Sequence, residues 1–159
     1  MGRSWLLPMI VAGIAALGIA MLGGTITDLG PWYQSLDKPD WTPPNFLFPV
    51  AWTAIFALAA VAAVATWRAA PNSRVADAVI GLFALNGFLN ILWSLIFFRM
   101  QRPDWAFAEL LSLWLSVGAL ILFCGRYSRL AAFALVPYIV WVSVAGALNW
   151  SIVELNGPL

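Results

Sequence analysis

The chain has 159 residues, of which 63% are apolar and only 15 (eight Lys or Arg and seven Asp or Glu) are charged. A soluble domain carries about 25% charged residues and cannot bury so much apolar surface, so the composition excludes a soluble or disordered chain. The net charge of +1, the lack of histidine and the single Cys124 exclude an electrostatic nucleic-acid binder, a histidine-ligated metal site and an intramolecular disulfide.

Five apolar stretches follow one another, each about as long as the 20 residues with which a helix crosses a bilayer. They cover residues 5–26, 46–67, 78–98, 105–125 and 130–153. Helix is expected for each, because lipid cannot satisfy the hydrogen bonds of an open sheet edge. The sequence therefore predicts an all-α integral membrane protein, with residues 1–159 forming a single bundle of five transmembrane helices.

The connection between the first two helices, residues 27–45, is much longer than the other three. It contains four prolines, two tryptophans and several charged residues. Loops of this length in compact proteins are usually lids or binding loops. We predict a structured lid, and a plain structured connector is the alternative.

The positive charges predict the orientation in the membrane. Five Lys or Arg residues lie on the face of the bundle that carries the N-terminus, and three lie on the opposite face. The five are Arg3, Arg68, Arg74, Arg126 and Arg129, and the three are Lys38, Arg99 and Arg102. Positive residues favour the cytoplasmic side, so we predict a cell-membrane protein with a cytoplasmic N-terminus.

The first helix carries a stripe of small residues that recur every four positions. The stripe consists of Ala12, Ala16, Ala20 and Gly24. Small residues at this spacing let another helix backbone approach closely. A homodimer formed through this stripe and packing within the chain are both consistent with it.

Several polar and aromatic residues inside the spans share the half of the bilayer beneath the long loop. Counted at about 1.5 Å per residue, they lie between about 6 and 18 Å from the loop end of their helices. They are Trp52, Asn90, Trp93, Glu109, Trp141 and Asn149. A cavity covered by a lid would produce this distribution.

Helical spacing places these residues on common faces with further aromatic side chains. The three stripes are Phe48, Trp52 and Phe56; Asn86, Asn90, Trp93 and Phe97; and Tyr138, Trp141, Ala145 and Asn149. Flat aromatic walls with a few amides suit a large, planar, mostly apolar ligand. The alternative for Asn86 and Asn90 is hydrogen bonding between helices, and the alternative for Glu109 is a structural role, such as an ion pair with Arg99 or Arg102.

Three segments resemble a known family. The segments are PWYQSLDKPDWTPPNFLFPVAWTAIF, ALNGFLNILWSLIFFRMQRPDWAFAELL and LVPYIVWVSVAGALNW. They are similar to the first loop with the second helix, the third-helix region and the fifth helix of the translocator protein family. This family is also called the tryptophan-rich sensory proteins, or TspO/MBR.

The resemblance implies a five-helix bundle, commonly a homodimer, that binds porphyrins, haem, sterols or benzodiazepine-type ligands under the first loop. The ligand-binding residues expected from the residue pattern and the resemblance together are Trp32, Trp41, Phe48, Trp52, Asn90, Trp93, Glu109, Tyr138, Trp141, Ala145 and Asn149. No metal site is expected. Without histidine, haem would lack its usual axial ligand, so metal-free protoporphyrin IX is the favoured ligand and no obligatory cofactor is expected.

One departure from the family and the lack of catalytic motifs narrow these expectations. Sterol-binding members end the last helix with a tyrosine followed by Lys or Arg, whereas this chain has Trp150 and no later basic residue. No conventional catalytic constellation is present either, so any enzyme activity would be a slow, light- and oxygen-dependent breakdown of porphyrin. In that case Trp52 and Trp141 would lie against the ring and donate to its excited state.

Three functions therefore stay open from the sequence. The first is tetrapyrrole binding and sensing, with or without breakdown of the ring. The second is transport of porphyrins or lipids across or along the membrane, and the third is a ligand-gated scaffold for partner proteins.

Overall fold

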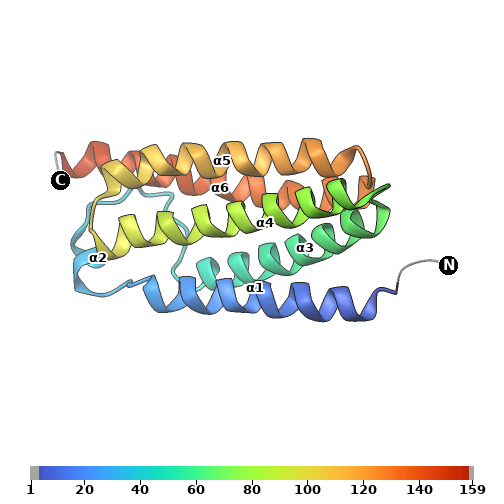
Figure 1. Cartoon of the computed structure of the whole chain (residues 1–159). Coiled ribbons are helices and arrows are strands. Elements are labelled where there is room, and N and C mark those ends of the chain that lie inside the picture. The colour runs from blue at the N-terminus through green and yellow to red at the C-terminus, as the bar shows by residue number, and fades with distance from the viewer. Residues whose placement is uncertain (1–3, 158–159) are drawn as a thin grey trace.

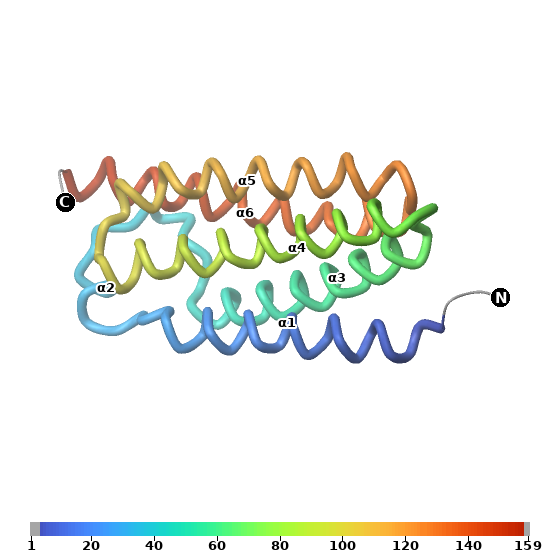
Figure 2. Tube along the Cα trace, viewed as in Figure 1, coloured from blue at the N-terminus to red at the C-terminus, as the bar shows by residue number. Residues whose placement is uncertain are grey.

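The computed structural model describes residues 4–157, and the whole of this part is helical or loop (Figure 1). Five long helices run side by side with a short sixth helix, α2, at one end. The elements are α1 (Leu6–Ile26), α2 (Pro31–Ser35), α3 (Leu47–Ala69), α4 (Ser73–Ser94), the π-helix η1 (Leu95–Arg99), α5 (Pro103–Gly125) and α6 (Arg129–Asn156). The described N- and C-terminal ends lie at opposite ends of the bundle, as five crossings require (Figure 2).

Within residues 4–157, five helices are long and apolar enough to span a membrane, which confirms the predicted fold class. The predicted bounds were wrong by a few residues, most of all for the third span, which begins at Ser73 rather than at residue 78. Asn72 fixes that start, because its side chain accepts a hydrogen bond of 3.0 Å from the amide of Val75. Helix α4 therefore begins before the apolar stretch, in a segment whose charged residues, such as Asp77, are exposed. Arg3, used in the charge count, lies outside the described residues.

The long loop is folded back on the bundle. It contains the buried Tyr33 in α2, and its Lys38 ammonium donates to the carbonyls of Tyr33 and Leu36 at 2.7 and 2.8 Å. Asn156 at the end of α6 accepts from the amide of Asp37 and donates to its carbonyl, both at 2.9 Å. These bonds join segments 119 residues apart in the sequence, so the loop is held to the bundle rather than only to its own ends.

The π-helix η1 changes the register at the end of the third span. The amide of Met100 bonds to the carbonyl of Leu95 at 2.9 Å, five residues back. Phe97 and Phe98, which are consecutive, are both buried at 3% and 8% exposure. In an α-helix consecutive side chains point about 100° apart, so the wider turn allows both rings to enter the core.

Helix α1 lies on the outside of the bundle and has no buried residue. It approaches α4 closely where a Cβ on Gly87 would come within 2.7 Å of the end of the Ile19 side chain. The small-residue stripe faces inward, since Ala12 and Ala16 line one cavity and Ala20 and Gly24 line another. The intramolecular role of the stripe is thus visible in the structure, whereas the homodimer stays a prediction.

Candidate functional site

A cavity of about 410 Å³ lies between α1, α3, α4 and α6, beneath the long loop. We call it the loop-side cavity. Its size falls within the range of about 300–1,000 Å³ that is usual for small-molecule sites. The residues that line it are Ala20, Gly23, Gly24, Thr27, Leu29, Tyr33, Phe48, Pro49, Trp52, Thr53, Phe56, Asn90, Trp93, Ser94, Phe97, Phe98, Ala145, Leu148, Asn149 and Ile152.

Six of the eleven predicted ligand-binding residues belong to this lining. They are Phe48, Trp52, Asn90, Trp93, Ala145 and Asn149. They come from three helices that are far apart in the sequence, and they meet around this one cavity. The remaining five, Trp32, Trp41, Glu109, Tyr138 and Trp141, lie behind the wall, in the loop or on α5.

One wall of the cavity is a layer of stacked aromatic rings on α3. The indole of Trp52 lies on the ring of Phe56, with centroids 5.5 Å apart and an interplanar angle of 21°. Tyr138 of α6 meets the same indole edge-on at 6.1 Å. Tyr138 is buried and does not line the cavity, so it supports Trp52 from the α6 side. This packing holds the indole as a flat surface for a planar ligand.

A buried hydrogen-bond network lies below the aromatic wall. The Tyr138 hydroxyl donates to Asn86 Oδ1 at 2.8 Å and accepts from Asn90 Nδ2 at 3.3 Å. Asn86 Nδ2 in turn donates to Ser116 Oγ at 2.9 Å, so the network joins α4, α5 and α6. Within residues 4–157 no donor contacts the Oδ1 atom of Asn90, which leaves this cavity-lining residue an acceptor for a ligand. Asn86 thus bonds between helices, and Asn90 both bonds between helices and lines the cavity.

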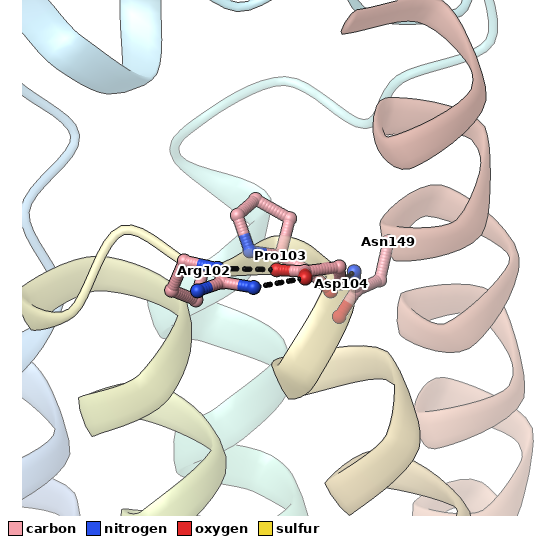
Figure 3. Close-up of polar contacts among 4 residues, drawn as sticks. All are labelled: Arg102, Pro103, Asp104 and Asn149. Carbon is pink, nitrogen blue, oxygen red and sulfur yellow. Dashed lines mark hydrogen bonds and ion pairs between the residues drawn. The ribbon is translucent and has the colours of Figure 1, made fainter. Parts of the chain in front are cut away.

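The other cavity asparagine, Asn149, is fully engaged with the protein. Its Nδ2 donates to the carbonyl of Pro103 at 2.7 Å, and its Oδ1 accepts from the Trp93 indole at 3.1 Å. Figure 3 shows Asn149 beside the start of α5, where Arg102 pairs with Asp104. Asn149 therefore fixes the Trp93 ring and the start of α5, and contributes shape rather than a free hydrogen-bonding group.

The two loop tryptophans are placed differently. Trp32 is half-buried and meets the cavity-lining Phe97 edge-on at 5.9 Å. Trp41 is 50% exposed and does not line the cavity. Three loop residues close the cavity, namely Thr27, Leu29 and the buried Tyr33, which is 3% exposed. Burial raises the pKa of the Tyr33 hydroxyl, so this roof residue stays neutral at physiological pH.

The polar side-chain atoms of Trp141 and Glu109 are buried, and neither residue lines the loop-side cavity. Trp141 packs edge-on against the cavity residue Phe48 at 5.7 Å, and its Nε1 has no partner within residues 4–157. Both carboxyl oxygens of Glu109 are likewise buried without a partner in the described chain. Neither predicted ion pair of Glu109 forms: Arg99 donates to the carbonyl of Thr25, and Arg102 pairs with Asp104.

The sequence prediction missed the contribution of α1 and two aromatic residues. Ala20, Gly23 and Gly24 form one side of the cavity, although they carry no functional group. Their small size at helical spacing was the available signal, and it was interpreted as a helix contact. Tyr33 was overlooked beside Trp32, and Phe98 was overlooked because its inward direction depends on the π-helix.

These features define a class of protein: a multi-pass integral membrane protein with five spanning helices and an aromatic cavity under its first loop. The sequence profile of the TspO/MBR family matches residues 10–155, and the chain belongs to this family. The family assignment from the loop and helix motifs is thereby confirmed.

Relatives from several sources support the assignment. The chain is 37% identical to Protein CrtK of Rhodobacter capsulatus over 150 residues, which is 94% of each chain. It is 35% identical to the tryptophan-rich protein TspO of Chlorobaculum tepidum, covering 88% of this chain and 90% of that one. The translocator protein of Bos taurus is 30% identical over 79% of this chain and 75% of its own.

Proposed function

We propose that this protein binds a planar tetrapyrrole of the protoporphyrin IX type in the loop-side cavity and acts as a sensor of it. The observation that carries the proposal is the flat Trp52–Phe56 wall beside the acceptor Asn90. A conjugated ring gains from stacking on such a wall, and a pyrrole N–H can donate to the amide oxygen. No metal ligand is needed, which favours the metal-free ring over haem.

The loop end of the cavity suits the carboxylates of such a ligand. The Lys38 ammonium lies 4.7 Å from the ring centre of the roof residue Tyr33. A propionate that reaches this roof would find the Tyr33 hydroxyl and a cation close together. The apolar part of the ring would then point toward Trp52 and Phe56, away from the loop.

A titration of the purified protein with protoporphyrin IX in darkness tests the proposal. We expect saturable quenching of tryptophan fluorescence with one ligand per chain, together with a shift of the main porphyrin absorbance band. Absence of a saturable signal would refute the proposal. Lys38→Gln should weaken the binding of protoporphyrin IX more than that of its dimethyl ester, because only the acid carries free propionates.

Light-dependent breakdown of the ring is a second candidate, favoured by the position of Trp52 on the cavity wall. An indole in contact with an excited porphyrin can donate an electron, with oxygen as the final oxidant. Illumination of the complex should then bleach the porphyrin more slowly in Trp52→Phe than in the wild type at equal occupancy. Equal decay would leave the protein a binder without this activity.

The setting of the protein is proposed along with its function. We place it in the cell membrane with the N-terminal end of α1 in the cytoplasm, because Arg68, Arg74, Arg126 and Arg129 lie at that end. A homodimer remains part of the proposal. It would use an outward face of α1, since the small-residue stripe faces the two cavities.

A further inference from the structure

A second cavity, of about 490 Å³, lies between α1, α3 and α4 at the end of the bundle away from the long loop. We call it the α1–α3–α4 slot. Its lining is apolar and rich in alanine, with Asn86 as the one residue that contributes an amide. The loop-side cavity shares only Phe56 with it. None of the predicted ligand-binding residues lines the slot.

The slot has the length of one lipid leaflet. Along α1 it extends from Leu7 to Ile19, or about 18 Å at 1.5 Å per residue. At its inner end α1 touches α4, because a Cβ on Gly87 would meet Ile19 at 2.7 Å. Half of a bilayer hydrocarbon core is about 15 Å thick. The slot therefore runs from one membrane surface to the middle of the bilayer and ends there.

The slot is narrow for its length. Its volume of 490 Å³ is spread over about 18 Å, whereas an α-helix with its side chains is about 10 Å across. The floor cannot yield much, since Ala60, Val64 and Val79 are already buried at 7%, 3% and 1% exposure. A single flexible hydrocarbon chain therefore suits this shape better than a whole helix of a second copy.

Positive charge marks the surface end of the slot. The Arg68 guanidinium lies 4.2 Å from the ring centre of Trp5, next to the lining residues Leu7 and Trp67. Arg74 is exposed in the first turn of α4 at the same end, with Asp77 as the single acid nearby. Basic residues at a membrane surface attract anionic lipid headgroups.

We propose that the α1–α3–α4 slot binds one acyl chain of an anionic phospholipid, whose phosphate lies at the end of the slot where the bundle carries Arg68 and Arg74. The acyl chain of the lipid packs against the alanine-lined walls, and the arginines select the headgroup. The site is separate from the loop-side cavity and does not depend on porphyrin binding. It makes this half of the protein a lipid-recognition surface.

Native mass spectrometry of the purified protein tests the proposal, with phosphatidylglycerol and phosphatidylcholine of identical acyl chains as probes. We expect one retained phosphatidylglycerol per chain and about a fivefold preference over phosphatidylcholine. Ala63→Leu places a larger side chain in the slot and should lower retention of both lipids about fivefold or more. Ala57→Leu, on the exposed side of α3, is the matched control and should retain lipid as the wild type does.

A second pair of substitutions tests the headgroup preference separately from the binding of the acyl chain. Arg68→Gln with Arg74→Gln should abolish the preference for phosphatidylglycerol while phosphatidylcholine is retained as before. Circular dichroism and thermal unfolding show that each variant is folded. Equal retention in Ala63→Leu and Ala57→Leu would overturn the slot as the site, and equal retention of the two lipids by the wild type would overturn headgroup selection. A change of oligomeric state in Ala63→Leu alone would assign the slot to a second copy and also overturn the proposal.

Discussion

Filling the loop-side cavity at Ala145 is the sharpest perturbation of the proposed porphyrin site. Ala145 of α6 is 8% exposed and lines the cavity, while its neighbour Leu148 is packed at 5% exposure. In Ala145→Leu the added methyl groups can enter only the cavity, which has space for them in the absence of ligand. The variant should therefore fold with little loss of stability.

The cost should appear when the ligand binds. Overfilling a packed site costs about 1–3 kcal/mol, which corresponds to about 5- to 150-fold weaker affinity. Fluorescence titration with protoporphyrin IX in darkness measures it. Ala147→Leu, exposed on the other side of the same helix, is the control and should bind as the wild type does. Wild-type affinity in a folded Ala145→Leu protein would refute the placement of the ligand against α6.

Three further predictions concern the supports of the site. Asn156→Ala removes both bonds to Asp37, so hydrogen exchange in the loop and porphyrin release should accelerate while exchange in the helices stays unchanged; unaltered exchange would show that this contact does not hold the loop. Tyr138→Phe leaves two buried amides short of a partner and should lower the free energy of unfolding by about 1–3 kcal/mol, measured by denaturant titration; an unchanged value would contradict the role of the network. Because burial raises the pKa of Tyr33, its neutral form contributes stability below about pH 10 that is lost at higher pH; Tyr33→Phe should flatten this alkaline decline in thermal unfolding, and an identical decline would contradict it.

Hydrophobicity and helical spacing were sufficient to predict the five spans and much of the site. A rise of 1.5 Å per residue gives each polar residue a depth, because a spanning helix has its ends fixed at the two membrane surfaces. Trp52, Asn90 and Ala145 meet in the cavity for that reason. The stripe that contains Asn90 was informative because a polar side chain is costly to place at random inside a membrane.

The errors arise where position depends on contacts between distant segments. Trp41 was expected to face the ligand from the loop, but the loop is held to the bundle through Asn156, and Trp41 is half-exposed and does not line the cavity. Phe98 enters the core only because of a π-turn, which hydrophobic spacing does not encode. Small residues of α1 were ambiguous because a close helix contact and a cavity wall both require a missing side chain.

Locating the bound ring is the most direct test of the central claim. A protoporphyrin derivative carrying a photoreactive diazirine would be bound in darkness and activated by a brief near-ultraviolet flash in the absence of oxygen, and its attachment sites mapped by mass spectrometry. The account predicts adducts on the lining segments 20–27, at the end of α1, and 48–56 of α3, lost on competition with unlabelled protoporphyrin IX. Adducts confined to the exposed faces of α1 or α5, or insensitive to competition, would contradict it.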